Sequence, residues 1–346
     1  MTLSIHNIKK SERNSNVELL RFVLMIGVCV QHMLVHGLSL KDMGTGNILP
    51  EAFDLLLLVI VAPAVNCFIF ISGYYGIRFS RKKILTLSIQ AFIIMFIVVV
   101  LRNGFGMGGD ELTKLYRCFP PVSVKAWWFL TEYVTIMLLS PFINNSISNI
   151  PRRTFEFSLC GLAMINCYGL WVTQKSTGSS LLGLLFVYLV ARYLAIYKVE
   201  LTLRRSLALL AVSTILLFTL TYTVHITGHT KYSWVLLWYC NPLIILQAIA
   251  LFFTVRAFRQ THIWIFNWVG AHCFAIYLFT ECFGQIQYRF WASLYREWTI
   301  IAALVVIFLS CLLIMIGDIV VMRITTIVRG YIQRIPFFED NPQIRN

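Results

Sequence analysis

The sequence predicts an all-α membrane protein, a polytopic helical bundle of about ten transmembrane helices with both termini in the cytoplasm. Three observations predict it: the composition, the lengths of the apolar segments, and the distribution of Lys and Arg between them. Of the 346 residues, 58% are hydrophobic and only 13% are charged, whereas a soluble domain carries about a quarter charged residues. The composition therefore indicates a chain that crosses the bilayer many times.

Ten apolar segments are each close to the length that crosses a hydrocarbon core of about 30 Å. Their approximate ranges are 17–36, 54–75, 84–102, 127–145, 155–173, 179–197, 206–225, 233–255, 265–285 and 299–322. They divide the chain into a cytoplasmic N-terminal segment (1–16), a ten-span membrane domain (17–322) and a cytoplasmic C-terminal tail (323–346). The polar N-terminal segment precedes an apolar run without a small-residue cleavage site, so this run is expected to remain as the first span.

The loops between these segments alternate in basic charge. Loops on the side of the N-terminus hold nineteen Lys and Arg residues, and loops on the other side hold nine. Because Lys and Arg are enriched in cytoplasmic loops, both termini are expected in the cytoplasm. The same rule accounts for the formal net charge of +14 without nucleic acid as a partner.

Common metal and nucleotide motifs are missing from the sequence. The nine cysteines are scattered singly with no C-x2-C pair, so neither a zinc site nor a disulfide framework is predicted. His36 follows His32 at a spacing that fits metal ligation, but no H-E-x-x-H pattern accompanies it. The sequence also has no nucleophile elbow, no phosphate loop and no Rossmann glycine pattern. No metal is therefore expected.

The first apolar segment carries two ionisable residues, Arg21 and His32, with ten residues between them. At about 100° and 1.5 Å per residue, an α-helix brings both side chains to one face, about 16 Å apart along its axis. Ionisable groups within a membrane are expensive and usually mark function. A neutral imidazole acts as a general base near pH 7, and a permanent cation holds an anionic ligand group.

Structural roles for these residues stay open. His32 is equally suited to a hydrogen bond between helices. Arg21 is equally suited to anchor the helix at the cytoplasmic headgroups, with Glu18, one turn earlier, as its ion-pair partner.

Three stretches of the chain resemble the acyltransferase 3 family of bacterial integral membrane acyltransferases. They are VELLRFVLMIGVCVQH with its Arg-x10-His element, VNCFIFISGYYG (65–76) with its Ser-Gly-aromatic motif, and WWFLTEYVTIMLLSPFIN (127–144) with its Trp-Phe-x-x-x-Tyr…Pro pattern. Ten spans also fit the family. One segment departs from it: in GAHCFAIYLFTE (270–281), Cys273 and Thr280 stand where members often have Ser and His.

The resemblance implies a multi-pass enzyme of the bacterial inner membrane that transfers an acyl group, commonly acetyl from acetyl-CoA, to a hydroxyl of a surface polysaccharide or its lipid-linked precursor. Acetyl-CoA, the carbohydrate acceptor and the lipid bilayer are then the expected partners. Arg21 is expected to attract the phosphates of CoA together with the basic residues after the second span, Arg78, Arg81, Lys82 and Lys83. His32 is expected to deprotonate the sugar hydroxyl, although an acetyl-histidine intermediate stays open.

The other two motifs supply further candidates. Ser72, Gly73 and Tyr74 are candidates for CoA binding, since Ser72 offers a hydrogen bond and Gly73 permits close approach; helix packing through small residues is the alternative.

Trp128 and Tyr133 are candidates for stacking on a sugar ring, the alternative being an aromatic belt. Glu132 is a secondary catalytic candidate that needs a cationic partner, for which Arg102 or Lys125 is available. Three further charged residues near span ends, Glu281, Arg192 and Asp318, are expected to be structural.

Two other functions fit parts of this pattern. A transporter or flippase of a lipid-linked saccharide would also use many spans and a buried Arg–His pair, but paired broken helices, which favour a transporter, are not evident in the sequence. A non-catalytic scaffold in a polysaccharide-assembly complex would tolerate changes at Arg21 and His32.

Overall fold

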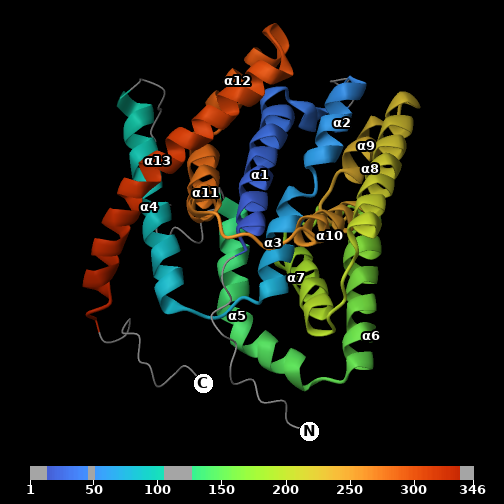
Figure 1. Cartoon of the computed structure of the whole chain (residues 1–346). Helices are drawn as coiled ribbons and strands as arrows, with labels where there is room; N and C mark the ends of the chain where they lie inside the picture. Colours follow the sequence, from blue (N-terminus) through green and yellow to red (C-terminus); the bar gives the residue numbers. More distant parts are fainter. Residues whose placement is uncertain (1–13, 46–50, 105–126, 336–346) are drawn as a thin grey trace.

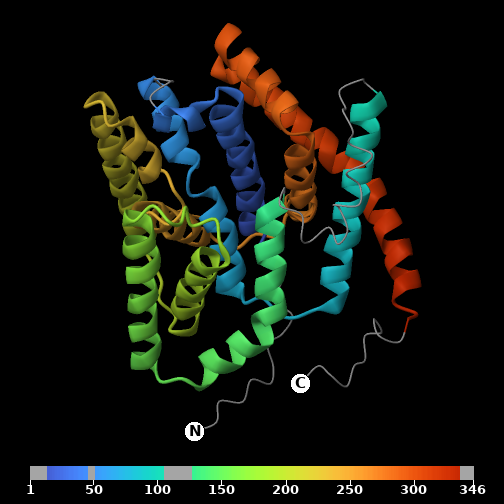
Figure 2. The ribbon, with the colours of Figure 1, turned by 180° about the vertical axis from the view of Figure 1, so that it is seen from behind.

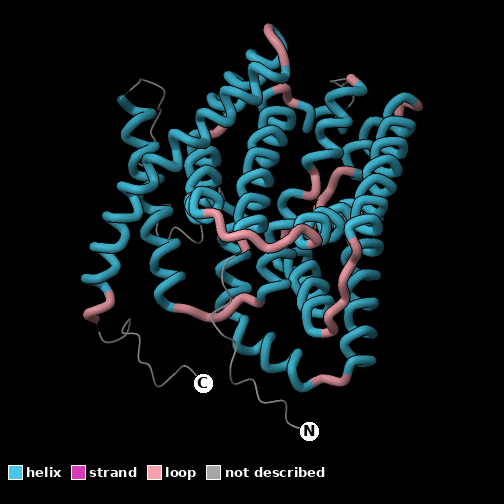
Figure 3. The backbone as a smooth tube through the Cα atoms, in the orientation of Figure 1, coloured by secondary structure: helices cyan, strands magenta, loops and turns pink. Residues whose placement is uncertain are grey.

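The computed structural model describes residues 14–45, 51–104 and 127–335. These residues form helices joined by turns and loops, and the part of the chain described contains no strand (Figure 3). The all-α prediction is therefore confirmed.

The first part of the chain forms a central helix and three further α-helices. The helices are α1 (Ser15–His32), α2 (Ala52–Val61), α3 (Ala64–Tyr75) and α4 (Arg81–Gly104). A π-helical turn, Met33–Gly37, extends α1, and a short 3₁₀ helix, Leu40–Thr45, follows it. In Figure 1, α1 stands in the middle of the bundle, where it packs against α3, α10, α11 and α13.

The middle part of the chain supplies four helices. They are α5 (Trp128–Asn149), α6 (Arg152–Ala163), α7 (Leu181–Ile196) and α8 (Leu203–Ile226). A π-helical segment, Met164–Leu170, extends α6. The ribbon of α5, which contains Pro141, changes direction along its length in both views (Figures 1 and 2), as expected where proline removes a helix hydrogen bond.

The last part of the chain returns to α1. Its helices are α9 (Thr230–Leu236), α10 (Pro242–Arg256), α11 (Trp264–Phe283), α12 (Gln285–Glu297) and α13 (Ile300–Ile332). Figure 1 shows α11 beside α1, and α4 beside α13. Seen from behind, α5 lies in front of α1 and α3 (Figure 2).

Among the described residues, five helical segments are long and apolar enough to cross a bilayer. They are Ser15–Gly37, Ala52–Tyr75, Arg81–Gly104, Leu203–Ile226 and Ile300–Ile332, and two shorter apolar helices are Leu181–Ile196 and Pro242–Arg256. The chain is thus a multi-pass membrane protein by the lengths of its helices. The number ten and the cytoplasmic location of both termini stay predictions.

The predicted span 233–255 is wrong as one continuous helix. The chain leaves the helix after Leu236 and re-enters it at Pro242, because proline disfavours helical geometry in the residue before it. Asn241 caps the new helix by accepting a hydrogen bond from the N–H of Leu243 at 2.9 Å. The amide of Asn66 donates to the carbonyl of Tyr239 at 2.8 Å, so this non-helical backbone is satisfied inside the protein.

A buried polar cluster joins α4, α11 and α13. The carboxylate of Asp318 accepts a hydrogen bond from Gln90 Nε2 at 2.8 Å, and its other oxygen lies 2.7 Å from His272 Nδ1. Asp318 is only 2% exposed, and a carboxylate at such a place is tolerated when it is paired. The cluster fixes the three helices that form one wall of the site described below, in line with the structural role expected for Asp318.

The amphipathic helix α12 covers the end of α1 that carries His32. Tyr288 and Trp291 are buried on its inner face, and Gly37 approaches it so closely that a side chain there would collide with the backbone of Tyr288. Asp54 of α2, which is fully buried, accepts from Arg296 Nη2 at 3.0 Å and from the hydroxyl of Tyr295 at 2.7 Å. These contacts hold α12 to α1 and α2.

Candidate active site

A cavity of about 580 Å³ runs along α1 inside the bundle. Its wall includes residues of α1, α3, α4, α5, α11 and α13, together with Tyr239 from the link between α9 and α10. Arg21 and His32 both line it, three helical turns apart. The prediction that these two side chains share one face of a helix is therefore confirmed, and the face is turned toward open space.

At one end of the cavity, His32 pairs with Glu281. His32 Nε2 lies 3.2 Å from Oε1 of Glu281 on α11, and the two side chains are 14% and 20% exposed. The ring of Tyr288 lies 5.0 Å from the imidazole ring, and His36 lies 5.6 Å from it on the next turn. His32 is the last residue of α1 before the π-helical turn, a feature that is frequent at functional sites.

An ionised Glu281 favours one tautomer of His32. When the carboxylate of Glu281 accepts the proton on Nε2, the lone pair of the neutral imidazole is on Nδ1. Nδ1 is buried and has no hydrogen-bond partner among the described residues. An imidazole with a carboxylate at one nitrogen and a lone pair free of hydrogen bonds at the other has the arrangement of a general base.

At the other end, the cavity wall is basic. Lys82 and Lys83 line it from the first turn of α4, and Arg329 lines it from the last turns of α13. Arg21 also lies toward this end, and its guanidinium donates to Glu18 at 3.2 Å. This confirms the predicted Glu18–Arg21 ion pair. Because Glu18 offsets only one of the four cations, this end of the cavity keeps a net positive charge.

Glu18 is held in place by the helix behind it. Gly270 of α11 faces Glu18, and a Cβ atom there would collide with the carboxylate. Arg329 in turn donates to the hydroxyl of Thr86 at 2.7 Å. The charged side chains at this end are thus positioned by packing between α1, α4, α11 and α13.

The sequence matches the profile of an acyltransferase domain, acyltransferase 3, over residues 14–317. The chain belongs to the acyltransferase 3 family. No curated protein and no solved structure matches it. The family indicates a membrane acyltransferase, and the cavity carries a candidate base where the family motif Arg-x10-His ends.

Of the three motif residues predicted to bind CoA, Ser72 lines this cavity, whereas Gly73 and Tyr74 lie outside it. Ser72 lines it, with its hydroxyl donating to the carbonyl of Phe68 at 3.0 Å. Gly73 instead packs against α7, where an added Cβ would lie 2.8 Å from the carbonyl oxygen of Tyr188. Tyr74 packs against Phe252 and lies under the guanidinium of Arg256, 4.6 Å from its ring centroid. Helix packing accounts for Gly73 and Tyr74.

Two of the predicted basic residues also lie outside the cavity wall. Arg78 is exposed and Arg81 is half-buried, and neither lines the cavity. Lys82 and Lys83 line the cavity instead. Helix α4 begins at Arg81, and its first turn directs these two lysines to the cavity.

The aromatic candidates of α5 do line the cavity. Trp128 and Tyr133 are both part of its wall, and Trp128 stacks on Tyr239 with ring centroids 5.9 Å apart. Glu132 is not part of the wall, and it makes no ion pair with a described residue. Its predicted partner Arg102 contacts the carbonyl of Cys282 at 3.5 Å, and Lys125 lies outside the described residues.

Several residues of the cavity were not predicted, among them Glu281, Tyr239 and Arg329. Glu281 was expected to be structural, although the rule that singled out His32, an ionisable group within an apolar segment, applies equally to it. Tyr239 had no signal of its own; the Asn241-Pro242 pair, which breaks the helix next to it, was the available hint.

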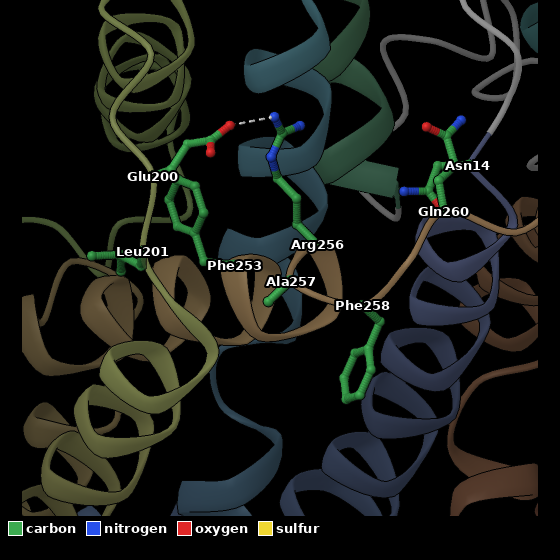
Figure 4. A pocket seen from close by; sticks show the side chains of 8 residues that line it. All are labelled: Asn14, Glu200, Leu201, Phe253, Arg256, Ala257, Phe258 and Gln260. Atoms are coloured by element: carbon green, nitrogen blue, oxygen red, sulfur yellow. Dashed lines mark hydrogen bonds and ion pairs between the residues drawn. The ribbon is translucent and has the colours of Figure 1, made fainter.

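A second, smaller hollow lies at the N-terminal end of α1, away from His32. It has a volume of about 240 Å³ and lies between Asn14, Arg256 and Glu200 (Figure 4). Arg256 donates to Glu200 at 3.0 Å across it, so its charges are neutralised within the protein. None of the predicted site residues lines it.

Proposed function

We propose that this acyltransferase moves an acetyl group from acetyl-CoA to a hydroxyl of a cell-surface or lipid-linked carbohydrate in the bacterial inner membrane. The observation that carries the proposal is the single cavity that joins the basic end, with Arg21, Lys82 and Lys83, to the His32–Glu281 pair. Such a cavity has the charge and the length that an extended, polyanionic thioester requires.

The donor would bind with its phosphates at the basic end. Lys82, Lys83 and Arg329 surround that end, and cations at the mouth of a cleft raise the local concentration of an anionic ligand. The apolar pantetheine arm would then follow α1 past Met25 and Val28, which line the cavity between the two ends. The thioester would reach the neighbourhood of His32, about 16 Å from Arg21 along the helix axis.

The reaction would follow general-base catalysis. His32 takes the proton of the acceptor hydroxyl on Nδ1, and Glu281 stabilises the imidazolium that forms. The oxygen attacks the carbonyl carbon of the thioester, and the proton on His32 passes to the departing thiolate. Trp128 and Tyr239 line the same cavity as His32, and their aromatic rings are suited to contact a sugar ring.

The transporter alternative is favoured by one observation. Residues 237–241 interrupt the helix between α9 and α10 beside the cavity. Such interrupted helices are typical of transporter sites. In this chain the break is held by polar contacts such as that from Asn66 to Tyr239, and it brings Tyr239 to the cavity wall.

Purified protein in lipid nanodiscs, supplied with acetyl-CoA labelled in the acetyl group, tests the proposal. Label in a carbohydrate acceptor, together with release of free CoA thiol, is the expected result. Transport of a labelled saccharide across proteoliposomes with no thiol release would favour the transporter instead.

A further inference from the structure

Tyr277 of α11 presents a buried hydroxyl that the protein itself does not use. The residue lines the cavity and is only 6% exposed, and its hydroxyl has no hydrogen-bond partner among the described residues. It precedes Glu281 by one helical turn, so the two side chains lie on the same side of α11. A buried hydroxyl without a partner is costly, so an acceptor atom supplied by a ligand would be favoured here.

The other tyrosines near His32 differ from Tyr277 in this respect. The hydroxyl of Tyr288 donates to the carbonyl of Thr280 at 3.0 Å. The hydroxyl of Tyr239 accepts from Gln31 Nε2 at 3.4 Å. Of these three tyrosines, Tyr277 is the one whose hydroxyl has no hydrogen-bond partner among the described residues.

The N-terminal turn of α5 faces the same hydroxyl. The backbone of Phe129 and Leu130, in the first turn of α5, lies close to the oxygen of Tyr277. The rings of Phe129 and Tyr277 meet edge to face, 6.1 Å apart, and Phe129 itself lines the cavity. The first amides of a helix have no partner within it and carry a partial positive charge.

This arrangement matches a need of acyl transfer. Attack of an oxygen nucleophile on a thioester turns the carbonyl oxygen into an oxyanion, and preorganised donors directed at that oxygen are a large source of rate. We propose that the hydroxyl of Tyr277, supported by the first turn of α5, donates to the oxyanion of the thioester carbonyl. This inference rests on the proposed function.

The acceptor oxygen forms a bond to the carbonyl carbon while its proton passes to His32 Nδ1, and the carbonyl π electrons become the charge on the oxyanion. The proton of Tyr277 stays on its own oxygen and is shared with the oxyanion by a hydrogen bond. When the carbonyl re-forms, the carbon–sulfur bond breaks, and the thiolate takes the proton from His32.

Tyr277→Phe removes the hydroxyl and keeps the ring. Acetyl transfer from acetyl-CoA by the purified protein in nanodiscs is expected to fall by about 10²-fold in kcat, with KM for acetyl-CoA within about twofold of wild type. A packing role alone would change neither quantity, because the ring contact with Phe129 remains.

Tyr222→Phe is the matched control. Tyr222 lies on α8 and stacks on Phe218 with centroids 5.7 Å apart, away from the cavity wall. This variant is expected to keep the wild-type kcat. Its thermal unfolding also gives the baseline for the loss of one tyrosine hydroxyl.

Full activity of Tyr277→Phe beside an active wild-type protein would overturn the oxyanion role and leave the proposed function intact. Failure of the wild-type protein itself to release CoA thiol with any acceptor would overturn both. If Tyr277→Phe loses activity and its unfolding temperature also falls well below that of Tyr222→Phe, the loss reflects unfolding and would count against a role in the reaction.

Discussion

Glu281 Oε1 lies 3.2 Å from His32 Nε2, across the interface between α11 and α1. The two residues are far apart in the sequence, and the packing of two long apolar helices brings them together. In an apolar interior, an imidazole next to a carboxylate has one nitrogen fixed as a donor and the other available as a base.

Replacement of Glu281 by Gln tests the pair itself. The amide keeps the size of the side chain but removes the charge that stabilises the imidazolium, so kcat for acetyl transfer should fall by roughly 10²–10⁴-fold. The measurement is steady-state thiol release from acetyl-CoA. Glu297→Gln, at the exposed end of α12, serves as the matched control; equal activity of the two variants would contradict the role of Glu281.

Lys82 and Lys83 should govern donor affinity. The double change to Ala is expected to raise KM for acetyl-CoA roughly tenfold, since an exposed ion pair contributes up to about 1 kcal/mol and 1.4 kcal/mol corresponds to a tenfold change in affinity. The increase should shrink at high ionic strength, where these charges are screened.

Arg78→Ala provides the comparison for this prediction. Arg78 belongs to the same basic stretch but is exposed and outside the cavity wall, so its removal should leave KM nearly unchanged. An equal increase in both variants would mean that the stretch acts as a diffuse charge rather than through the cavity.

Gly73 separates packing from ligand binding in the Ser-Gly-aromatic motif. A Cβ added there would lie 2.8 Å from the carbonyl oxygen of Tyr188, so Gly73→Ala should force α3 and α7 apart and destabilise the protein by about 1–3 kcal/mol. The unfolding temperature should fall while KM for acetyl-CoA stays constant.

Gly317→Ala is the control for that experiment, because nothing lies within 4 Å of a Cβ at this position of α13. An unchanged unfolding temperature for Gly73→Ala, together with a raised KM, would assign Gly73 to ligand binding after all.

The sequence alone predicted the face that Arg21 and His32 share, because helix periodicity within one segment decides it. It did not predict Glu281 as the partner of His32. That choice depends on which face of α11 packs against α1, a tertiary relationship that no local pattern encodes.

The same distinction explains the basic end and the broken helix. The local pattern marked the whole stretch from Arg78 to Lys83 as basic, but the start of α4 at Arg81 selects Lys82 and Lys83 for the cavity. A run of apolar residues predicted one span over 233–255, whereas Asn241 and Pro242 end the helix locally. Hydropathy averaged over a segment does not detect such a break.

The acetyl content of surface polysaccharide, measured in cells that carry either the wild-type chain or His32→Ala at matched membrane abundance, tests the central claim most directly. The account predicts O-acetyl groups with the wild-type chain and their loss with His32→Ala. Equal acetylation in both would contradict an acyltransferase that acts through His32.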